Sequence, residues 1–123
     1  MMALYDNNNP FAKIIRGEIP CDMLLEGTYC VIFHDINPQA KGHLLIVPKG
    51  FYTNFEDFLT NADETEILGF FKEVKEFLNK QNIKDGFRII TNQGKDAGQE
   101  IEHLHFHLLY GERLGSLKEN PIS

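Results

Sequence analysis

The feature that most constrains this chain is a run of alternating histidine and apolar residues, His103-Leu104-His105-Phe106-His107. Such alternation predicts a β-strand, because successive side chains of a strand point to opposite faces of a sheet. The imidazoles would stand on one face, about 6–7 Å apart, and the leucine and phenylalanine side chains would pack in the core. We therefore predict a final strand over residues 101–110 that carries the chemistry of the protein.

Burial in a core does not explain this histidine row, because each neutral imidazole has a donor and an acceptor that need partners. Three interpretations are open from the residues alone. The row is a solvated polar face, part of a zinc site, or a site of covalent phosphorus chemistry in which one neutral imidazole attacks and its neighbours orient it and donate protons. A zinc site would need a further ligand, and the sequence has no matching cysteine cluster.

The rest of the chain predicts an α+β domain with a mainly antiparallel sheet, one long helix and one short helix. Apolar residues at steps of three and four predict the long helix over residues 63–80, capped by Asn61 or Asp63. The aromatic and acidic segment 51–60 is predicted to be irregular. The other expected elements are a short helix over 11–16, strands over 23–26, 29–34, 43–47 and 86–92, a turn over 35–42 and a loop over 93–99.

Length and composition exclude several classes of protein. The 123 residues suit one domain, in which residues 1–10 are expected to form a mobile tail and residues 111–123 a C-terminal tail. No membrane span or signal peptide is apparent, so a cytoplasmic protein without a membrane partner is expected, with Cys21 and Cys30 as reduced thiols. A net charge of −6 disfavours binding to a nucleic-acid polymer, although local donors can still hold a small anion.

The histidine run resembles the motif of the histidine triad (HIT) superfamily, His-φ-His-φ-His-φ-φ with φ apolar, which His103 to Leu109 match. The stretches FAKIIRGEIP, IFHDINPQAKGHLLIVPK and TNQGKDAGQE are similar to those of the branch called histidine triad nucleotide-binding proteins. The resemblance runs from Phe11 to Leu109. It implies a HIT-like fold, and a homodimer in which two sheets join into one.

The resemblance also implies a nucleotidyl-transfer site. In the family the middle histidine attacks the α-phosphorus of a nucleotide, and water then releases a nucleoside monophosphate from the nucleotidyl-histidine. This role falls to His105, while His103 and His107 would orient it and bind phosphate oxygens. The fourth histidine of the family matches His43, which the residues alone would equally present as a strand-start histidine bonded to a loop.

A nucleotide-binding set follows from the same resemblance. Asp35 matches the acidic residue that holds the ribose hydroxyls, although an Asp that opens a turn before Asn37 is an equal interpretation. Asn92 and the segment Gly98-Gln99-Glu100 match the phosphate-side loop, and the role of Glu100 is open because some relatives carry a serine there. The other residues expected around the nucleoside are Phe11, Ile15, Phe33, His34 and Ile36.

Two departures from the family pattern limit what the resemblance implies. Some relatives bind zinc through an N-terminal cysteine where this chain has Ala12, so no metal and no other cofactor is expected. Many relatives follow the triad with Gly-Gly-Arg, where this chain has Gly111-Glu112-Arg113. The expected function is hydrolysis of a purine nucleoside phosphoramidate. The alternatives are a dinucleoside polyphosphate hydrolase, whose branch tends to carry glutamine at the position of Asn92, a nucleotide-binding dimer with little turnover, and a metal-dependent hydrolase.

Overall fold

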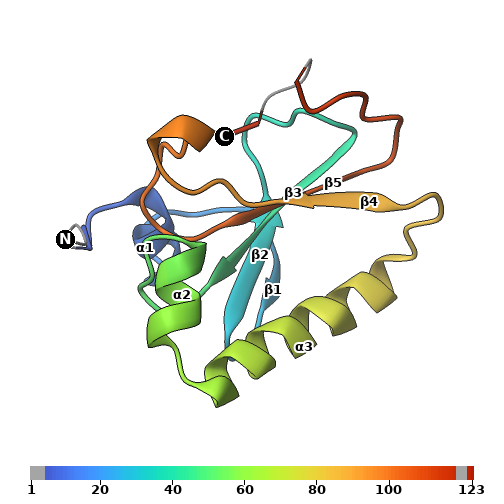
Figure 1. Cartoon of the computed structure of the whole chain (residues 1–123). Helices are drawn as coiled ribbons and strands as arrows, with labels where there is room; N and C mark the ends of the chain where they lie inside the picture. The colour runs from blue at the N-terminus through green and yellow to red at the C-terminus, as the bar shows by residue number, and fades with distance from the viewer. Residues whose placement is uncertain (1–4, 119–121) are drawn as a thin grey trace.

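The computed structural model describes residues 5–118 and 122–123, which form one five-stranded sheet with helices on both of its faces (Figure 1). The strand order is β1-β2-β3-β5-β4, and every neighbouring pair is antiparallel. This confirms the predicted fold class. The elements are α1 (Pro10–Ile15), β1 (Met23–Glu26), β2 (Cys30–His34), β3 (Gly42–Pro48), α2 (Phe55–Asn61), α3 (Glu64–Gln81), β4 (Phe87–Ile90), the 3-10 turn η1 (Lys95–Ala97) and β5 (Phe106–Tyr110).

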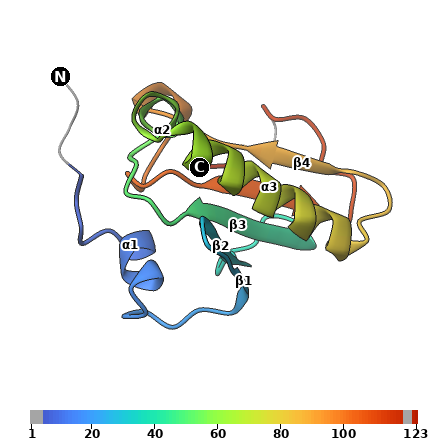
Figure 2. The same cartoon turned by 90° about the horizontal axis from the view of Figure 1, so that it is seen from below.

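Two apolar cores lie on opposite faces of the sheet. The longest helix, α3, lies with α2 on one face, and α1 lies on the other (Figure 2). Phe70, Val74 and Phe77 of α3 pack in the first core, while Phe11 of α1 packs in the second. Because strand side chains alternate between faces, the central strand β3 contributes to both cores and is buried along its whole length. Because both faces of β3 are buried, its sequence after His43 is apolar at every position.

The helices begin at side-chain caps, and one of them corrects the sequence analysis. The Asp63 side chain accepts the N–H of Glu66 at 2.8 Å and starts α3, as predicted. Segment 51–60 was predicted to be irregular, but it contains most of the seven-residue helix α2. Its cap is Asn54, whose side chain accepts the N–H of Asp57 at 2.8 Å. A capping asparagine before acidic residues is the sequence signal for this helix.

The segment that carries the histidines is only partly a strand. The strand was predicted from residue 101, but β5 begins at Phe106, and the N–H of Leu104 donates instead to the carbonyl of Tyr52 at 2.7 Å. The alternation of side chains persists outside the ladder, because Leu104 and Phe106 both pack in the core under α3. The side chains therefore keep alternating from Leu104 onward, with His105 and His107 turned away from that core, while His103 lies in a bend just before this stretch.

Residues 5–9 lie against the domain and differ from the free tail expected over residues 1–10. Asn9 caps α1 by accepting the N–H of Ala12 at 2.9 Å, and its side-chain amide donates to the carbonyl of Asp6 at 2.8 Å. Arg16 donates to the carbonyl of Asn7 at 2.9 Å. Residues 1–4 of that tail, and residues 119–121 of the C-terminal tail, lie outside the described residues.

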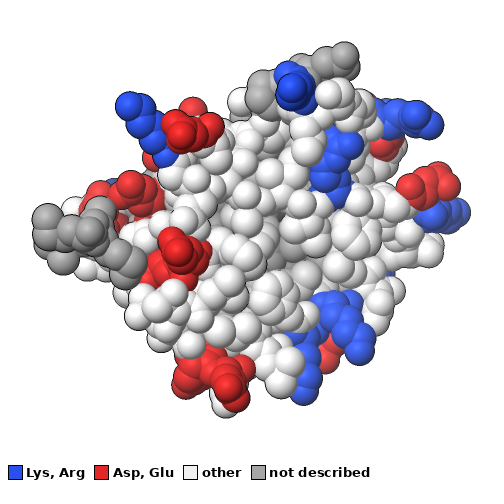
Figure 3. Space-filling model, in the orientation of Figure 1, with Lys and Arg blue, Asp and Glu red and all other residues white. Residues whose placement is uncertain are grey.

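The surface carries its charges in separate groups. On the face seen in Figure 3 the charged side chains stand mainly around the rim of a largely uncharged centre. This face has no continuous basic stripe of the kind that follows a nucleic-acid backbone. Within residues 5–118 and 122–123, no helix is both long enough and apolar enough to cross a bilayer.

Candidate active site

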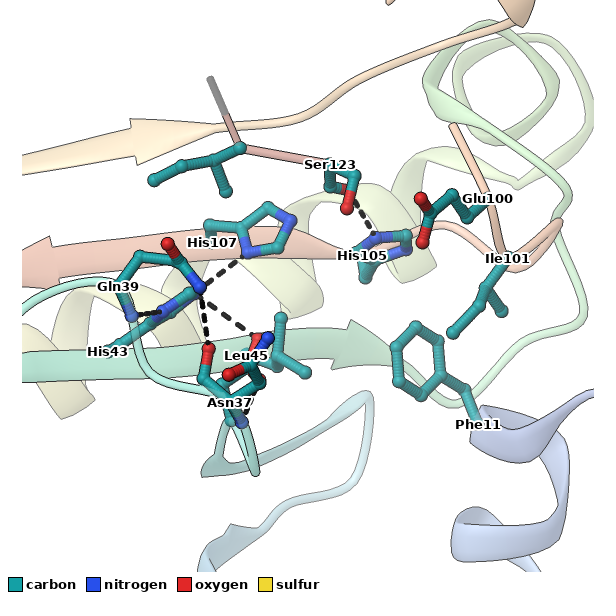
Figure 4. Close-up of a pocket in the computed structure, with 12 residues that line it drawn as sticks. Phe11, Asn37, Gln39, His43, Leu45, Glu100, Ile101, His105, His107 and Ser123 are labelled. Carbon is teal, nitrogen blue, oxygen red and sulfur yellow. Dashed lines mark hydrogen bonds and ion pairs between the residues drawn. The ribbon is translucent and has the colours of Figure 1, made fainter. Parts of the chain in front are cut away.

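The histidines border a pocket of about 320 Å³, a size within the usual range for small-molecule sites. The pocket lies on the face of the sheet that α1 covers, away from α3, because Phe11 and Leu45 belong both to its lining and to the core under α1. Figure 4 shows polar side chains of the β2–β3 loop at one end, and Phe11 and Ile101 at the other. The described lining residues are Phe11, Asp35, Asn37, Gln39, His43, Leu45, Glu100, Ile101, His105, His107, Ile122 and Ser123.

His105 is held so that one ring nitrogen faces the pocket. Its Nδ1 lies 2.8 Å from the backbone carbonyl of His103. A carbonyl only accepts, so Nδ1 carries the proton, and in the neutral ring the lone pair is on Nε2. That nitrogen faces the backbone oxygen of Ser123 at 3.3 Å, at the side of the pocket shown in Figure 4. In its neutral form the ring therefore has its nucleophilic atom toward the pocket.

A chain of hydrogen bonds sets the proton on His107. The backbone N–H of Gln39 donates to Nδ1 of His43 at 2.9 Å, so the proton of the neutral His43 ring is on Nε2. That Nε2 lies 2.9 Å from Nδ1 of His107 and donates to it. His107 must then carry its own proton on Nε2, a buried atom that makes no hydrogen bond of normal geometry among the described residues, although the Ser123 carbonyl lies near enough to act on its pKa. A proton donor therefore stands beside the nucleophile, whose ring centroid is 5.3 Å from that of His107.

Asp35, His43 and His107 also offer three potential metal ligands, whose donor atoms lie within 4.8 Å of one another. The hydrogen bond from Gln39 argues against this use, because a metal on Nε2 of His43 would need the lone pair of a nitrogen that already carries a proton. The carboxylate of Asp35 lies 3.3 Å from the same Nε2 and accepts the Asn37 N–H at 2.8 Å. The geometry suits a proton chain better than a metal site.

Burial favours the neutral forms of His43, His103 and His107. It lowers the pKa of His43, against the opposing effect of the Asp35 carboxylate. It also lowers the pKa of His107, where the Ser123 carbonyl and Asp35 oppose the shift and the neighbouring histidines add to it. The fully buried His103 has a pKa lowered to about 4, again mainly by burial. Neutral rings are the state that the proton chain requires.

Some of the residues predicted to surround the nucleoside line the pocket, and others do not. Phe11 and Asp35 line the pocket as expected. Phe33 is buried in the core under α1, and Ile15 packs against the edge of that core, so neither lines the pocket. Ile36 is 99% exposed, because it sits on the outward side of the β2–β3 loop, and it is not a wall of the pocket.

Three more of the predicted residues, His34, Asn92 and Gly98, do not line the pocket. His34 is exposed at the end of β2, with its Nε2 3.7 Å from the Asp22 carboxylate. Asn92 donates through its side chain to the backbone carbonyl of Ile122, which lines the pocket. Gly98 ends η1 with a left-handed φ of 78°, which a residue with a Cβ rarely adopts.

The phosphate-side loop is tied to its surroundings by Gln99. Its side-chain amide donates to the carbonyls of Thr53 and Ile101 at 2.7 and 3.0 Å, and its oxygen accepts the N–H of Gly94 at 3.0 Å. Gln99 therefore holds the loop in place and does not line the pocket. Glu100, the next residue, does line it, and its side chain lies beside His105 in Figure 4.

Sequence reasoning missed several residues of the site. Gln39, whose backbone sets the proton on His43, lies in a segment predicted only as a turn. Leu45 and Ile101 supply apolar walls, and strand alternation from His43 would have found Leu45, two residues along the same face. Tyr5, which bonds to Nδ1 of His103, has no local signal in the sequence.

The fold and site together define a class: small α+β proteins in which histidines on and beside an antiparallel sheet, here His43, His105 and His107, line a pocket. Comparison with known proteins gives the family. A family model described as the HIT domain matches residues 16–114. The chain therefore belongs to the HIT family, as the histidine run predicted.

Proteins that are similar along nearly the whole chain are described as members of the same family. A protein of Azospirillum brasilense, described as an uncharacterized 13.2 kDa HIT-like protein, is 48% identical over 95% of this chain and 97% of its own length. A histidine triad protein from Clostridium difficile has a TM-score of 0.79, with 34% identity over 92% of this chain and 98% of that one. A HIT family hydrolase from Legionella pneumophila has a TM-score of 0.78, with 33% identity over 88% of this chain and 96% of that one.

Proposed function

We propose that the protein hydrolyses a purine nucleoside phosphoramidate through a nucleotidyl intermediate on His105. One observation carries the proposal: the His103 carbonyl fixes the proton of His105 on Nδ1, and Nε2 faces the pocket beside the Nε2–H of His107. Membership of the HIT family supports a hydrolase that acts on nucleotides in general, and the Legionella relative is described as a hydrolase.

The reaction takes place in two displacements. Nε2 of His105 attacks the α-phosphorus, a P–N bond to the histidine forms, and the P–N bond to the amine breaks. The amine nitrogen keeps the electron pair of that bond and takes up a proton as it leaves. Water then attacks the phosphorus and gives up a proton that replaces the one taken up by the amine. The P–N bond to His105 breaks, the nucleoside monophosphate is released, and the neutral histidine is restored.

The neighbouring groups suit the charge that develops during these steps. The Nε2–H of His107 is a preorganised donor to a phosphate oxygen, and such donors contribute most where water is excluded. The carboxylate of Asp35 can accept both hydroxyls of a ribose once it exchanges its contact with His43 for the sugar. Phe11 and Leu45 supply apolar surface for a base.

The charge of the pocket favours a phosphoramidate over a dinucleoside polyphosphate. Its described lining contains no lysine and no arginine, while it contains Asp35 and Glu100. A departing polyphosphate would carry several negative charges, with no cationic side chain there to stabilise them. A departing amine is neutral or cationic and does not need such a group.

The experiment compares two substrates and two histidines. We expect turnover of adenosine monophosphate linked to a fluorogenic amine, and much slower turnover of a diadenosine polyphosphate. His105→Ala should abolish turnover, and acid-quenched wild-type protein should carry one nucleoside monophosphate on His105 by mass spectrometry. The matched control is His34→Ala, because His34 is exposed and outside the pocket. Wild-type turnover in His105→Ala would refute the mechanism.

We also propose that the protein is a homodimer in which the β4 edges of two sheets lie together. β4 is an edge strand, with backbone groups open to pairing on one side. Phe87 and Ile89 of this strand are 48% and 42% exposed, and Phe71 of α3 is 41% exposed. Sedimentation equilibrium should give the mass of two chains, and Ile89→Lys should shift it toward one chain. A wild-type monomer would refute the proposal.

A further inference from the structure

Tyr5 reaches across the fold to a histidine of the triad. Its hydroxyl forms a hydrogen bond with Nδ1 of His103, a residue 98 positions away in the sequence. The phenol ring stacks on Phe51, with the ring centroids 5.0 Å apart and an angle of 13° between the planes. Neither Tyr5 nor His103 lines the described pocket. Tyr5 can therefore act on the reaction only indirectly, and its hydrogen bond to His103 connects it to the triad.

The direction of this hydrogen bond follows from the other nitrogen of the ring. Nε2 of His103 lies 2.9 Å from the carbonyl of Pro48, which only accepts, so Nε2 carries the proton. In the neutral ring Nδ1 is then an acceptor, and the Tyr5 hydroxyl donates to it. Burial raises the pKa of Tyr5, so the phenol keeps its proton at neutral pH. Both nitrogens of His103 are thereby satisfied inside the protein, as a fully buried imidazole requires.

His103 in turn holds the nucleophile, because its backbone carbonyl accepts the Nδ1–H of His105 at 2.8 Å. His103 lies in a bend before β5 and outside its ladder, so neighbouring strands do not fix it as they fix His107. This stretch is held by the bonds from the His103 ring to Tyr5 and Pro48, by the bond from the Leu104 N–H to Tyr52, and by the bond that the Thr91 hydroxyl donates to the His105 carbonyl.

We propose that Tyr5 is a positioning residue: by donating to Nδ1 of His103, it keeps that ring neutral and oriented, and so keeps the His103 carbonyl at the position that fixes the proton of His105. The catalytic part rests on the proposed function, because it takes His105 as the nucleophile. The segment is anchored for this role, since Asn9 links Asp6 to the start of α1.

The test removes one hydroxyl and keeps the ring. Tyr5→Phe retains the stack on Phe51 and removes the hydroxyl, which donates to His103 and also interacts with the Asn9 side chain. The matched control is Tyr29→Phe, because Tyr29 packs at the core under α3 and its hydroxyl has no hydrogen-bond partner within the described part of the chain. We expect kcat for the phosphoramidate to fall about three- to tenfold in Tyr5→Phe, the equivalent of one neutral hydrogen bond. KM should stay unchanged, and Tyr29→Phe should match wild type in both.

The second readout is the ¹⁵N NMR spectrum of the imidazoles, which needs no substrate. In wild type, His103 should be the Nε2–H tautomer with a hydrogen-bonded Nδ1, and His105 the Nδ1–H tautomer. In Tyr5→Phe the Nδ1 resonance of His103 should move toward that of a free acceptor, and the Nδ1–H population of His105 should fall. The pKa of His103, about 4 in wild type, should rise, because the lost bond stabilised only the neutral ring. Tyr5 and His105 are the titratable groups that face it.

The outcomes are decisive in either case. A wild-type kcat in Tyr5→Phe, or an unchanged tautomer of His105, overturns the proposal. A wild-type protein that fails to turn over the phosphoramidate refutes the proposed function instead, and the tautomers of His103 and His105 then decide the positioning role by themselves. Thermal unfolding of both variants checks that a loss of rate is not a loss of folded protein.

Discussion

The proton chain through His43 makes a sharp prediction about catalysis. His43→Leu puts an apolar side chain of similar size in place of the imidazole in the buried strand. It removes two hydrogen bonds, one from the Gln39 N–H and one to Nδ1 of His107, both 2.9 Å long. His107 would then be free to place its proton on either nitrogen. In the tautomer with the proton on Nδ1, it has no proton to donate into the pocket.

The size of the effect lies between two limits. The lower limit is the loss of one neutral hydrogen bond, about 0.5–1.5 kcal/mol. The upper limit is the loss of one preorganised donor in the transition state, about 10²–10³ in rate. Since His107 keeps its ring, we expect kcat to fall about ten- to hundredfold, the equivalent of about 1.4–2.7 kcal/mol in activation free energy.

Two polar variants separate the proton chain from simple packing at this position. A glutamine amide reaches about as far from Cβ as Nε2 of histidine, so His43→Gln can still donate to His107. An asparagine oxygen lies near the position of Nδ1, so His43→Asn can accept the Gln39 N–H but does not reach His107. Stopped-flow turnover should therefore rank Gln above Asn and Leu. Equal rates for Gln and Leu would refute the assigned tautomers.

Three further predictions concern stability and binding. Glu73→Gln should lower the free energy of unfolding in urea by about 1–3 kcal/mol, because the Glu73 carboxylate accepts three backbone N–H groups at 2.7–3.0 Å before and at the start of β2. The control Glu76→Gln, at an exposed position of the same helix, should leave that free energy unchanged. His103, with a folded pKa of about 4 against 6.5 unfolded, binds its proton more readily in the unfolded chain. Stability should therefore be lost as pH falls from about 6.5 to 4, by about 3 kcal/mol, and His103→Gln should show a weaker pH dependence. Asp35→Asn should raise KM for a ribonucleoside phosphoramidate about tenfold but leave KM for the dideoxy analogue unchanged; an equal rise for both would rule out ribose contact.

Periodicity predicted the parts of the fold that depend on which face a side chain occupies. The alternation around His105 placed the histidines away from the α3 core correctly, even though the strand ladder begins only at Phe106. The long helix and its Asp63 cap were also predicted, because both are local patterns. The helix α2 was missed because its aromatic residues do not repeat over enough turns to show a period.

The parts that could not be predicted depend on contacts between distant segments. Ile36 was assigned to the pocket as an apolar residue near Asp35, but the direction of a loop side chain follows from the turn and not from a period, and it is 99% exposed. The bond from Tyr5 to His103 joins residues that no local pattern relates. Among the residues supplied by the resemblance, Asp35 and Phe11 line the pocket while Phe33 lies in the core, and no sequence pattern indicates which hydrogen bonds they make.

The register between β3 and β5 links the apolar core to the chemistry of the pocket. Leu45 pairs with His107, and His43 pairs with Leu109, so the two histidines are diagonal neighbours on one face. Diagonal pairs on one face are within reach of each other's side chains, and here the two ring nitrogens lie 2.9 Å apart. A slip of one residue would turn one strand over and bury its histidine against α3. The apolar residues of the opposite face, Leu44 among them, prevent that slip. The packing under α3 therefore determines where the proton of His107 resides.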